Sequence, residues 1–350
     1  MEVSDNELKN LVLAVSTEIE IGQLTAKRLA GLMTARYGGT DASGAWSWRM
    51  AYDVMEAGFI HFVLSQRPED DPATESRRLI HLQGALPTQT RRSEAQLRLQ
   101  QFSTPLAYAH LVSCAAGITH TDKMLEPSAG TGSMALFAHR AGAHLCLNEI
   151  DPFRARLLAV NFGNEPTSHN GEHIDDLLGE AKRPSVVMMN PPFSSSIKRA
   201  GDPTIAARHL VSTAKRLADG GRIVAIMPDG FLGTQQRLWF ERFSKIVRPR
   251  MILKMPGAIY RKTGTSVNTV LVVADKIEGG DEVAPINVTS LDEALSRIEN
   301  DLPERSKPCV SASEDRVVAP SPRLQVPPRR STTTSHAKTA SHSERPLNPT

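Results

Sequence analysis

Residues 124–133 read Met-Leu-Glu-Pro-Ser-Ala-Gly-Thr-Gly-Ser, a short apolar strand that runs into a glycine turn. Glycine suits such a turn because the backbone must bend sharply and approach a ligand with no Cβ in the way. A helix over 132–141 is expected to follow. The stretch predicts the first strand–turn–helix unit of an α/β sheet, although an ordinary turn of no further significance would account for it equally well.

An acidic residue closes the next expected strand. Glu149 lies twenty-three residues after Glu126, within Leu-Asn-Glu-Ile-Asp at 147–151. In doubly wound folds a carboxylate at this position accepts hydrogen bonds from ribose hydroxyls, and the alternative is a solvated charge. The turn lacks a Gly-x-Gly-x-x-Gly pattern, and Glu126 before it would repel a pyrophosphate. These features argue against NAD and favour a ligand with a cationic end.

A third segment, Val-Val-Met-Met-Asn-Pro-Pro-Phe at 186–193, indicates a class of chemistry. The exocyclic amine of a nucleobase is a poor nucleophile because its lone pair is delocalised into the ring. An amide oxygen and a backbone carbonyl that accept the amine hydrogens localise this lone pair, and paired prolines keep that carbonyl in place. The aromatic ring of Phe193 can stack on an extruded base. The alternative is a loop that merely ends a strand.

Short apolar runs alternate with helical stretches between residues 101 and 280, which is typical of a parallel sheet with crossover helices. The expected strands are 123–125, 145–150, 185–189, 222–227, 251–255 and 267–274. The expected helices are 132–141, 152–162, 203–218 and 238–247, with another over 291–298.

Composition divides the chain into five parts. Apolar residues recur with helical spacing near the N-terminus, whereas the C-terminal forty residues are rich in Ser, Pro and Thr and contain no aromatic residue. The parts are a helical N-terminal region (1–65), a polar linker or exposed helices (66–100), the α/β domain (101–280), a short extension (281–310) and a disordered tail (311–350).

The overall composition excludes several classes of protein. With 350 residues, 40% of them hydrophobic, and a formal net charge of +3, the chain can bury a large core. No apolar run reaches the roughly 18–20 residues of a membrane span, and the polar N-terminus does not look like a secretory signal. Three widely spaced cysteines form neither a disulfide framework nor a zinc motif, so a cytoplasmic location is expected.

The three segments, in this order, resemble the class I S-adenosylmethionine-dependent N6-adenine DNA methyltransferases. Phe-Ser-Thr-Pro at 102–105 is similar to the family's Phe-x-Thr-Pro element, and residues 220–228 are similar to its fifth strand. Residues 257–272 resemble the terminal hairpin of type I restriction-modification methylase subunits. The resemblance covers about residues 100–276 in γ-type order, and more loosely extends to the methyltransferase region associated with strawberry-notch-type helicases.

The resemblance implies an α/β fold, namely a Rossmann-like class I methyltransferase sheet with crossover helices and a C-terminal β-hairpin, preceded by a small helical region. It also implies S-adenosylmethionine as cofactor. Phe102, Thr104 and Pro105 would line its methionine side. Glu126 would approach the ammonium beside the backbone of Gly130 and Gly132. Glu149 would hold the ribose, Ile150 would pack on the adenine, and Asp175 or its neighbour Asp176 would accept the adenine amino group. Asp175 is favoured.

The implied catalytic loop consists of Asn190, Pro191, Pro192 and Phe193. No metal is expected, because a sulfonium methyl group is already an activated electrophile. His139, His144, His169 and His173 have no metal-ligand spacing. The sequence predicts methyl transfer to N6 of adenine in DNA. An RNA-adenine methyltransferase, a protein-glutamine methyltransferase and a non-catalytic nucleic-acid-binding relative remain alternatives.

The expected partner is DNA, as the carrier of the substrate adenine, and no membrane is involved. A target-recognition domain needs roughly a hundred residues, and too few ordered-looking residues follow the expected hairpin to form one. The sequence therefore favours a helicase or a specificity subunit as a further partner that supplies target recognition.

Overall fold

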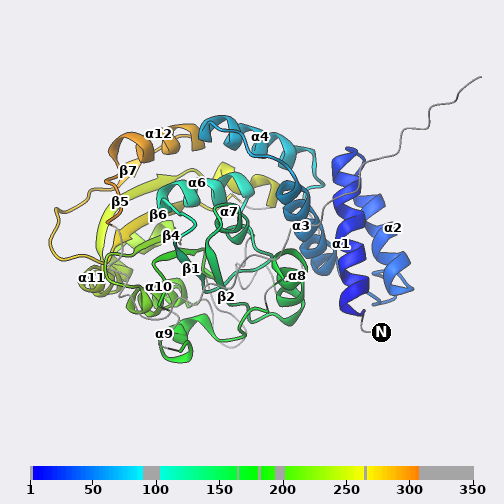
Figure 1. Ribbon diagram of the computed structural model, residues 1–350, viewed down its shortest axis with the longest axis horizontal. Coiled ribbons are helices and arrows are strands. Elements are labelled where there is room, and N and C mark those ends of the chain that lie inside the picture. Colours follow the sequence, from blue (N-terminus) through cyan, green and yellow to red (C-terminus); the bar gives the residue numbers. More distant parts are fainter. Residues whose placement is uncertain are drawn as a thin grey trace, which may run out of the picture. The chain divides into compact units, whose positions relative to one another are not determined.

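Seven strands form one sheet in the computed structural model, which describes residues 3–89, 103–163, 165–179, 183–193, 202–263 and 266–306. The strand order is β2-β1-β3-β4-β6-β5-β7 (Figure 1). The strands are β1 (Lys123–Glu126), β2 (His144–Leu147), β3 (Val186–Met189), β4 (Arg222–Pro228), β5 (Arg248–Met255), β6 (Thr269–Asp275) and β7 (Ile286–Asn287).

Strands β1 to β4 run parallel to one another, whereas β6 lies antiparallel between β4 and β5. Strands β5 and β6 follow one another in the chain and form the expected hairpin. The short β7, which the sequence did not predict, pairs with β5 in parallel. The predicted α/β class, with crossover helices and a C-terminal hairpin, is confirmed.

Helices cover both faces of the sheet. Alternate residues of each strand face opposite sides, so Val186 and Met188 of β3 join one apolar cluster and Val187 and Met189 join the other. The first cluster also contains α6 (Leu106–Ala116), α7 (Ala135–Arg140), α8 (Pro152–Phe162) and α12 (Leu291–Asp301). The second is covered by α9 (Ile174–Leu177), α10 (Ile205–Arg216) and α11 (Arg237–Ile246).

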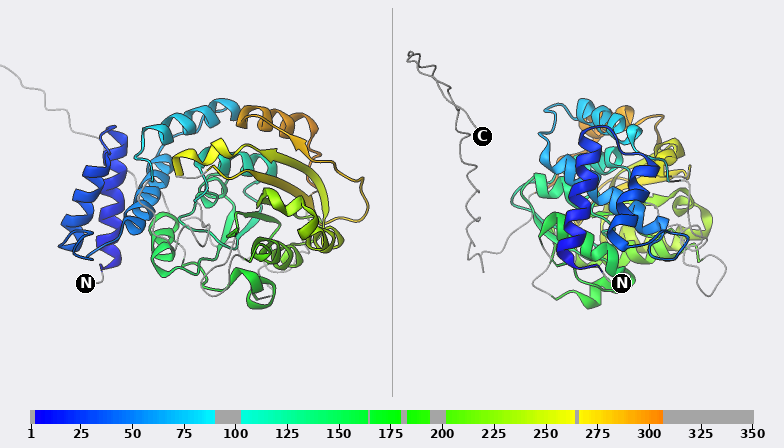
Figure 2. Two further views of the ribbon diagram at one scale, coloured as in Figure 1. Left: turned by 180° about the vertical axis from the view of Figure 1, so that it is seen from behind. Right: turned by 90° about the vertical axis from the view of Figure 1, so that its right-hand side faces the viewer.

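The N-terminal region consists of α1 (Asp5–Glu20), α2 (Ala26–Tyr37) and α3 (Trp48–Ser65). Helix α3 is apolar on most faces because it lies between α1 and the α/β part of the chain, where it contacts α8 (Figure 2). Gly58 allows the close approach to α1, since a Cβ there would lie 2.6 Å from Cγ1 of Val15. The N-terminal region therefore packs directly beside the β2–α8 unit.

A layer of helices outside the sheet completes the fold. Helix α4 (Pro72–Ala85) lies within the stretch for which the sequence left open a linker or exposed helices. It contacts α6 and α12, and α4 and α12 lie end to end in Figure 1. The described residues belong to one compact unit, which includes the extension after the hairpin as far as residue 306. The predicted tail, residues 311–350, and residues 90–100 lie outside the described residues.

No helix in the described ranges is long and apolar enough to cross a membrane.

Candidate functional site

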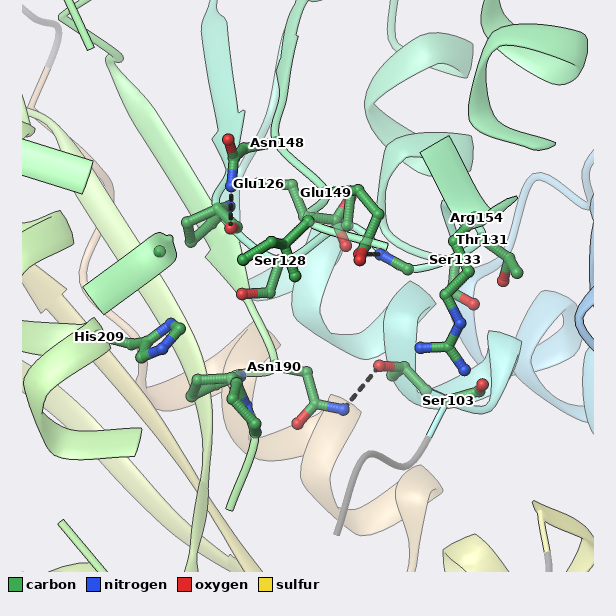
Figure 3. A pocket seen from close by; sticks show the side chains of 18 of the residues that line it. Ser103, Glu126, Ser128, Thr131, Ser133, Asn148, Glu149, Arg154, Asn190 and His209 are labelled. Carbon is green, nitrogen blue, oxygen red and sulfur yellow. Dashed lines mark hydrogen bonds between the residues drawn. The ribbon is translucent and has the colours of Figure 1, made fainter. Parts of the chain in front are cut away.

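A cleft of about 220 Å³ opens at the carboxyl ends of β1, β2 and β3 (Figure 3). Strand β1 lies between β2 and β3, so the strands that follow β1 in the chain are added first on one side of it and then on the other. Ligands of open α/β sheets bind at the point where the strand order reverses in this way. Most of the predicted site residues line this cleft: Thr104, Glu126, Gly130, Glu149, Ile150, Asn190, Pro191 and Pro192.

The carboxylate of Glu149 is held by two backbone amides. Gly130 N–H donates to Oε2 at 2.7 Å, and Asp151 N–H donates to Oε1 at 2.8 Å. Burial raises the pKa of Glu149, whose side chain lines the cleft. Each carboxylate oxygen can accept a further hydrogen bond. A fixed pair of acceptors of this kind suits two neighbouring hydroxyl groups.

Glu126 is buried at the end of β1, where its Oε2 accepts a hydrogen bond of 3.1 Å from Ala135 N–H. Burial raises the pKa of this carboxyl well above its ordinary value, and the nearby Glu149 carboxylate adds to the effect. Glu126 thus lines the cleft with one carboxyl oxygen already engaged by a backbone amide.

The two glycines of the turn have different surroundings. Gly130 has a φ of +56° and open space where a Cβ would lie, and it lines the cleft. Gly132 has a φ of +99°, and a Cβ there would lie 2.4 Å from Cε2 of Phe162 on α8. Gly132 is absent from the cleft lining, so its lack of a side chain serves the packing of the turn against α8.

The expected catalytic loop begins at the end of β3 and projects Asn190 into the cleft (Figure 3). Nδ2 of Asn190 donates to Oγ1 of Thr104 at 2.9 Å. This contact places the donor end of the amide against Thr104, and the amide oxygen Oδ1 is buried. Pro191 and Pro192 line the cleft, whereas Phe193 is 4% exposed and belongs to the apolar core.

Other predicted residues lie away from the cleft. Pro105 is buried at the start of α6, and Phe102 lies outside the described residues. Asp175 accepts hydrogen bonds from Ser212 and, at 2.7 Å, from Lys215. Burial opposes ionisation, but these two partners lower the pKa of Asp175. Asp176 is exposed, and neither aspartate is among the residues that line the cleft.

The structure adds residues that sequence reasoning missed. Asn170 lines the cleft in the segment where an acidic residue was expected, and it caps the turn at 171–173. Asn148 joins the glycine turn to this segment, because Nδ2 donates to the carbonyl oxygens of Pro127 and His169 at 2.9 Å each. The sequence signal for Asn170 was weak, since it precedes the more conspicuous Asp175-Asp176 pair by five residues.

His209 of α10 also lines the cleft and is 4% exposed. Its Nδ1 has no hydrogen-bond partner among the described residues, and Gly171 leaves room for the ring, since a Cβ there would lie 2.8 Å from Nδ1. Burial lowers the pKa of His209 to about 4, so the ring is neutral at pH 7. A neutral imidazole beside Asn170 suits a polar heterocycle better than an anion.

Within the part of the chain that the structure describes, no three His, Cys, Asp or Glu side chains are grouped so that they could hold a metal ion.

No family model and no curated protein matches the chain. Three solved structures resemble it at low sequence identity. A candidate class I S-adenosylmethionine-dependent methyltransferase from Listeria monocytogenes is 13% identical, with 85% of this chain and 98% of that one covered and a TM-score of 0.49. The modification subunit of a candidate type I restriction enzyme from Vibrio vulnificus is 13% identical, with 87% and 92% covered and a TM-score of 0.47.

A candidate RNA methyltransferase from Pyrococcus horikoshii is 21% identical, with 58% of this chain and 99% of that one covered and a TM-score of 0.42. At such identities the similarity concerns the fold and does not extend to the substrate.

Proposed function

We propose that the protein transfers a methyl group from S-adenosylmethionine to the N6 amino group of adenine in DNA. The observation that carries the proposal is the contact between Asn190 and Thr104. Asn190 follows the central strand β3 and lines the cleft, and Thr104 engages the donor end of its amide, so the oxygen is the end of the side chain that would accept from a substrate amine. An acceptor that is already in place is what an incoming aromatic amine requires.

The residues around the cleft fit this cofactor. Glu149 offers two fixed acceptors for ribose hydroxyls, and Gly130 leaves open space beside them. The side chain of Ile150 is 59% exposed although it is apolar, and it lines the cleft where a flat ring could cover it. In place of the expected Asp175, we propose that Asn170 meets the polar edge of the adenine, because an amide can both donate and accept.

The cofactor would supply an activated methyl group, and the protein's own residues would prepare the nucleophile. Oδ1 of Asn190 and the backbone carbonyl of Pro191 accept the two hydrogens of the adenine amine, which localises its lone pair toward the methyl group. Thr104 keeps the Asn190 amide in the productive orientation. The paired prolines restrict the backbone, so little reorganisation accompanies the reaction.

We propose an anchoring role for Phe193 in place of base stacking. Its ring is buried in the core cluster, and stacking on an extruded base would require it to leave this environment. A buried aromatic side chain directly after the prolines ties the loop to the sheet. The loop then keeps its position while the substrate base enters.

DNA is the proposed carrier of the adenine because the catalytic loop ends in Phe and follows a Phe-x-Thr-Pro element. A helicase or a specificity subunit is the proposed source of target recognition. The test is methyl transfer from labelled S-adenosylmethionine to duplex DNA, to RNA and to a glutamine-containing peptide, with the full-length protein. Transfer to adenine in DNA supports the proposal, and transfer confined to RNA or peptide would overturn the choice of substrate.

A further inference from the structure

One end of the cleft is built with help from the N-terminal helix α3. Ser103, Thr131, Ser133 and Arg154 line this end, whereas His209 lies at the other end (Figure 3). Two carboxylates of α3, Asp53 and Glu56, reach residues of this group. Neither carboxylate is itself part of the cleft lining, so both act on a ligand only through the side chains that they hold.

Asp53 holds Arg154. Nε and Nη2 of Arg154 lie 3.0 and 2.8 Å from Oδ1 of Asp53, and both residues are less than 10% exposed. In the described part of the chain, the hydrogen bonds of the guanidinium group all go to Asp53. A guanidinium carries five N–H donors. Arg154 therefore has N–H donors left for a ligand in the cleft, and a planar set of donors suits a carboxylate.

Glu56 holds two hydroxyl groups at the same end of the cleft. Its Oε2 accepts from Oγ of Ser103 at 2.7 Å and from Oγ1 of Thr131 at 3.1 Å, and its Oε1 accepts from Nε2 of Gln89 at 2.6 Å. A hydroxyl has one proton, and these two protons point at Glu56. What Ser103 and Thr131 offer to a ligand is thus their oxygen lone pairs, which suit an ammonium group.

We propose that this end of the cleft is a receptor for a zwitterionic amino-acid group, in which Arg154 binds the carboxylate and Ser103 and Thr131 accept the ammonium. Asp53 and Glu56 are positioning residues. The inference deepens the proposed function, because the methionine part of S-adenosylmethionine carries these two groups. It also gives α3 a binding role, so the N-terminal region completes the cofactor site.

Glu126 is the alternative partner for the ammonium. It is buried at the end of β1, where one of its oxygens already accepts Ala135 N–H, whereas Ser103 and Thr131 lie beside Arg154 at this end of the cleft (Figure 3).

The test compares three nucleosides by calorimetry with the full-length protein. S-Adenosylhomocysteine has both groups, its decarboxylated analogue has only the ammonium, and 5′-methylthioadenosine has neither. Arg154→Gln should weaken binding of S-adenosylhomocysteine by about 10- to 100-fold, the equivalent of one charge-assisted hydrogen bond. It should leave the affinities of the other two ligands within a factor of about two of the unmodified protein.

Glu56→Gln should weaken both ligands that carry an ammonium and spare 5′-methylthioadenosine. Arg156→Gln is the matched control, because Arg156 lies on the same helix and pairs with Asp5 away from the cleft. It should change none of the three affinities. Equal losses for all three ligands in Arg154→Gln, or no loss at all, would overturn the inference.

Loss of Arg154 alone leaves the buried Asp53 with only the longer ion pair to Arg49, at 3.9 Å, and the variant could fail to fold. The double variant Asp53→Asn, Arg154→Met removes both charges, and the same selective loss is expected for it. If the unmodified protein binds none of the three nucleosides, the proposed function itself fails. If it binds all three and the variants do not discriminate among them, only this inference fails.

Discussion

Asn190 and Thr104 are separated by 86 positions in the chain and joined by one hydrogen bond in the cleft. The sequence predicted both residues as parts of a site, one in the Asn-Pro-Pro-Phe loop and one in the Phe-x-Thr-Pro element. It did not predict that they touch. The contact follows from packing of the segment before α6 against the end of β3, and no local pattern encodes such a distance.

The replacement Glu149→Ala should weaken S-adenosylmethionine binding by about ten- to a few-hundred-fold, because two charge-assisted hydrogen bonds to the ribose are lost. Gly130 N–H and Asp151 N–H also lose their acceptor, so the melting temperature should fall. Calorimetry and thermal unfolding measure the two effects separately. An unchanged affinity would mean that the ribose does not lie at Glu149.

Glu126 predicts a pH-dependent stability. Burial raises the pKa of Glu126 well above its ordinary value of 4.5. In the pH interval between the pKa of the unfolded chain and that of the native state, the native protein therefore keeps a proton that the unfolded chain has lost. This contribution to stability therefore decreases as pH rises through that interval. Glu126→Gln does not titrate and its amide oxygen can still accept Ala135 N–H, so the variant should be more stable than the native protein at neutral pH.

The measurement is the difference in melting temperature between Glu126→Gln and the native protein from pH 4.5 to 8. This difference should shrink toward zero at the acid end. The native protein alone is not diagnostic, since burial lowers the pKa of His209 to about 4, and this acts in the opposite direction. Glu278→Gln, at an exposed position, is the control. A difference that is independent of pH would contradict the prediction.

The sequence predicted the bounds of a helix correctly where capping residues mark both ends of that helix. Helix α8 was predicted at its observed bounds, because Asp151 caps it, Pro152 begins it and Gly163 ends it. Helix α6 was missed because it is buried and apolar on nearly every face, so it shows no helical periodicity. The strand after Gly142 ends earlier than expected, at Leu147, and Asn148 makes an isolated bridge to Thr167.

The contact between α1 and α3 can be tested through two helical glycines. A Cβ at Gly58 would lie 2.6 Å from Cγ1 of Val15, whereas a Cβ at Gly84 of α4 would meet nothing within 4 Å. Gly58→Ala should destabilise the protein by about 1–3 kcal/mol through overpacking. Gly84→Ala should stabilise it by about 0.4–1 kcal/mol, since it only restricts the unfolded chain.

Urea unfolding measures both changes in stability. Because α3 also carries Asp53 and Glu56, Gly58→Ala should in addition weaken cofactor binding, and Gly84→Ala should not. Equal stability of the two variants would mean that α1 and α3 are not packed as closely as the structure shows.

For the whole molecule, the division at residue 309 has consequences that the sequence did not predict. The extension after the hairpin is tied to the sheet by Arg305, which pairs with Asp122 at 2.6 Å, and by Arg222, which donates to the Pro303 carbonyl at 2.8 Å. These contacts join residues far apart in the chain. Composition predicted a tail from residue 311, rich in Ser, Pro and Thr, but it could not predict which side chains tie the extension to the sheet.

Truncation after residue 309 should leave the melting temperature and the cofactor affinity unchanged. Residues 310–350 contain six Lys or Arg and three Asp or Glu, so the truncation removes three net positive charges. DNA binding should weaken at low salt, and the difference from the full chain should vanish as salt increases, because the contribution is electrostatic. A difference that persists at high salt would indicate specific contacts made by the tail.

We propose that Asn190 accepts a hydrogen of the adenine amine, and methyl transfer depends on this contact. Its most direct test is nucleoside mass spectrometry of duplex DNA after incubation with S-adenosylmethionine and either the native protein, Asn190→Ala or Asn300→Ala, whose asparagine lies on α12. We expect N6-methyladenine with the native protein and with Asn300→Ala, and a loss of about 10²–10³ in rate for Asn190→Ala with unchanged cofactor affinity. Near-native formation of N6-methyladenine by Asn190→Ala would contradict the proposal.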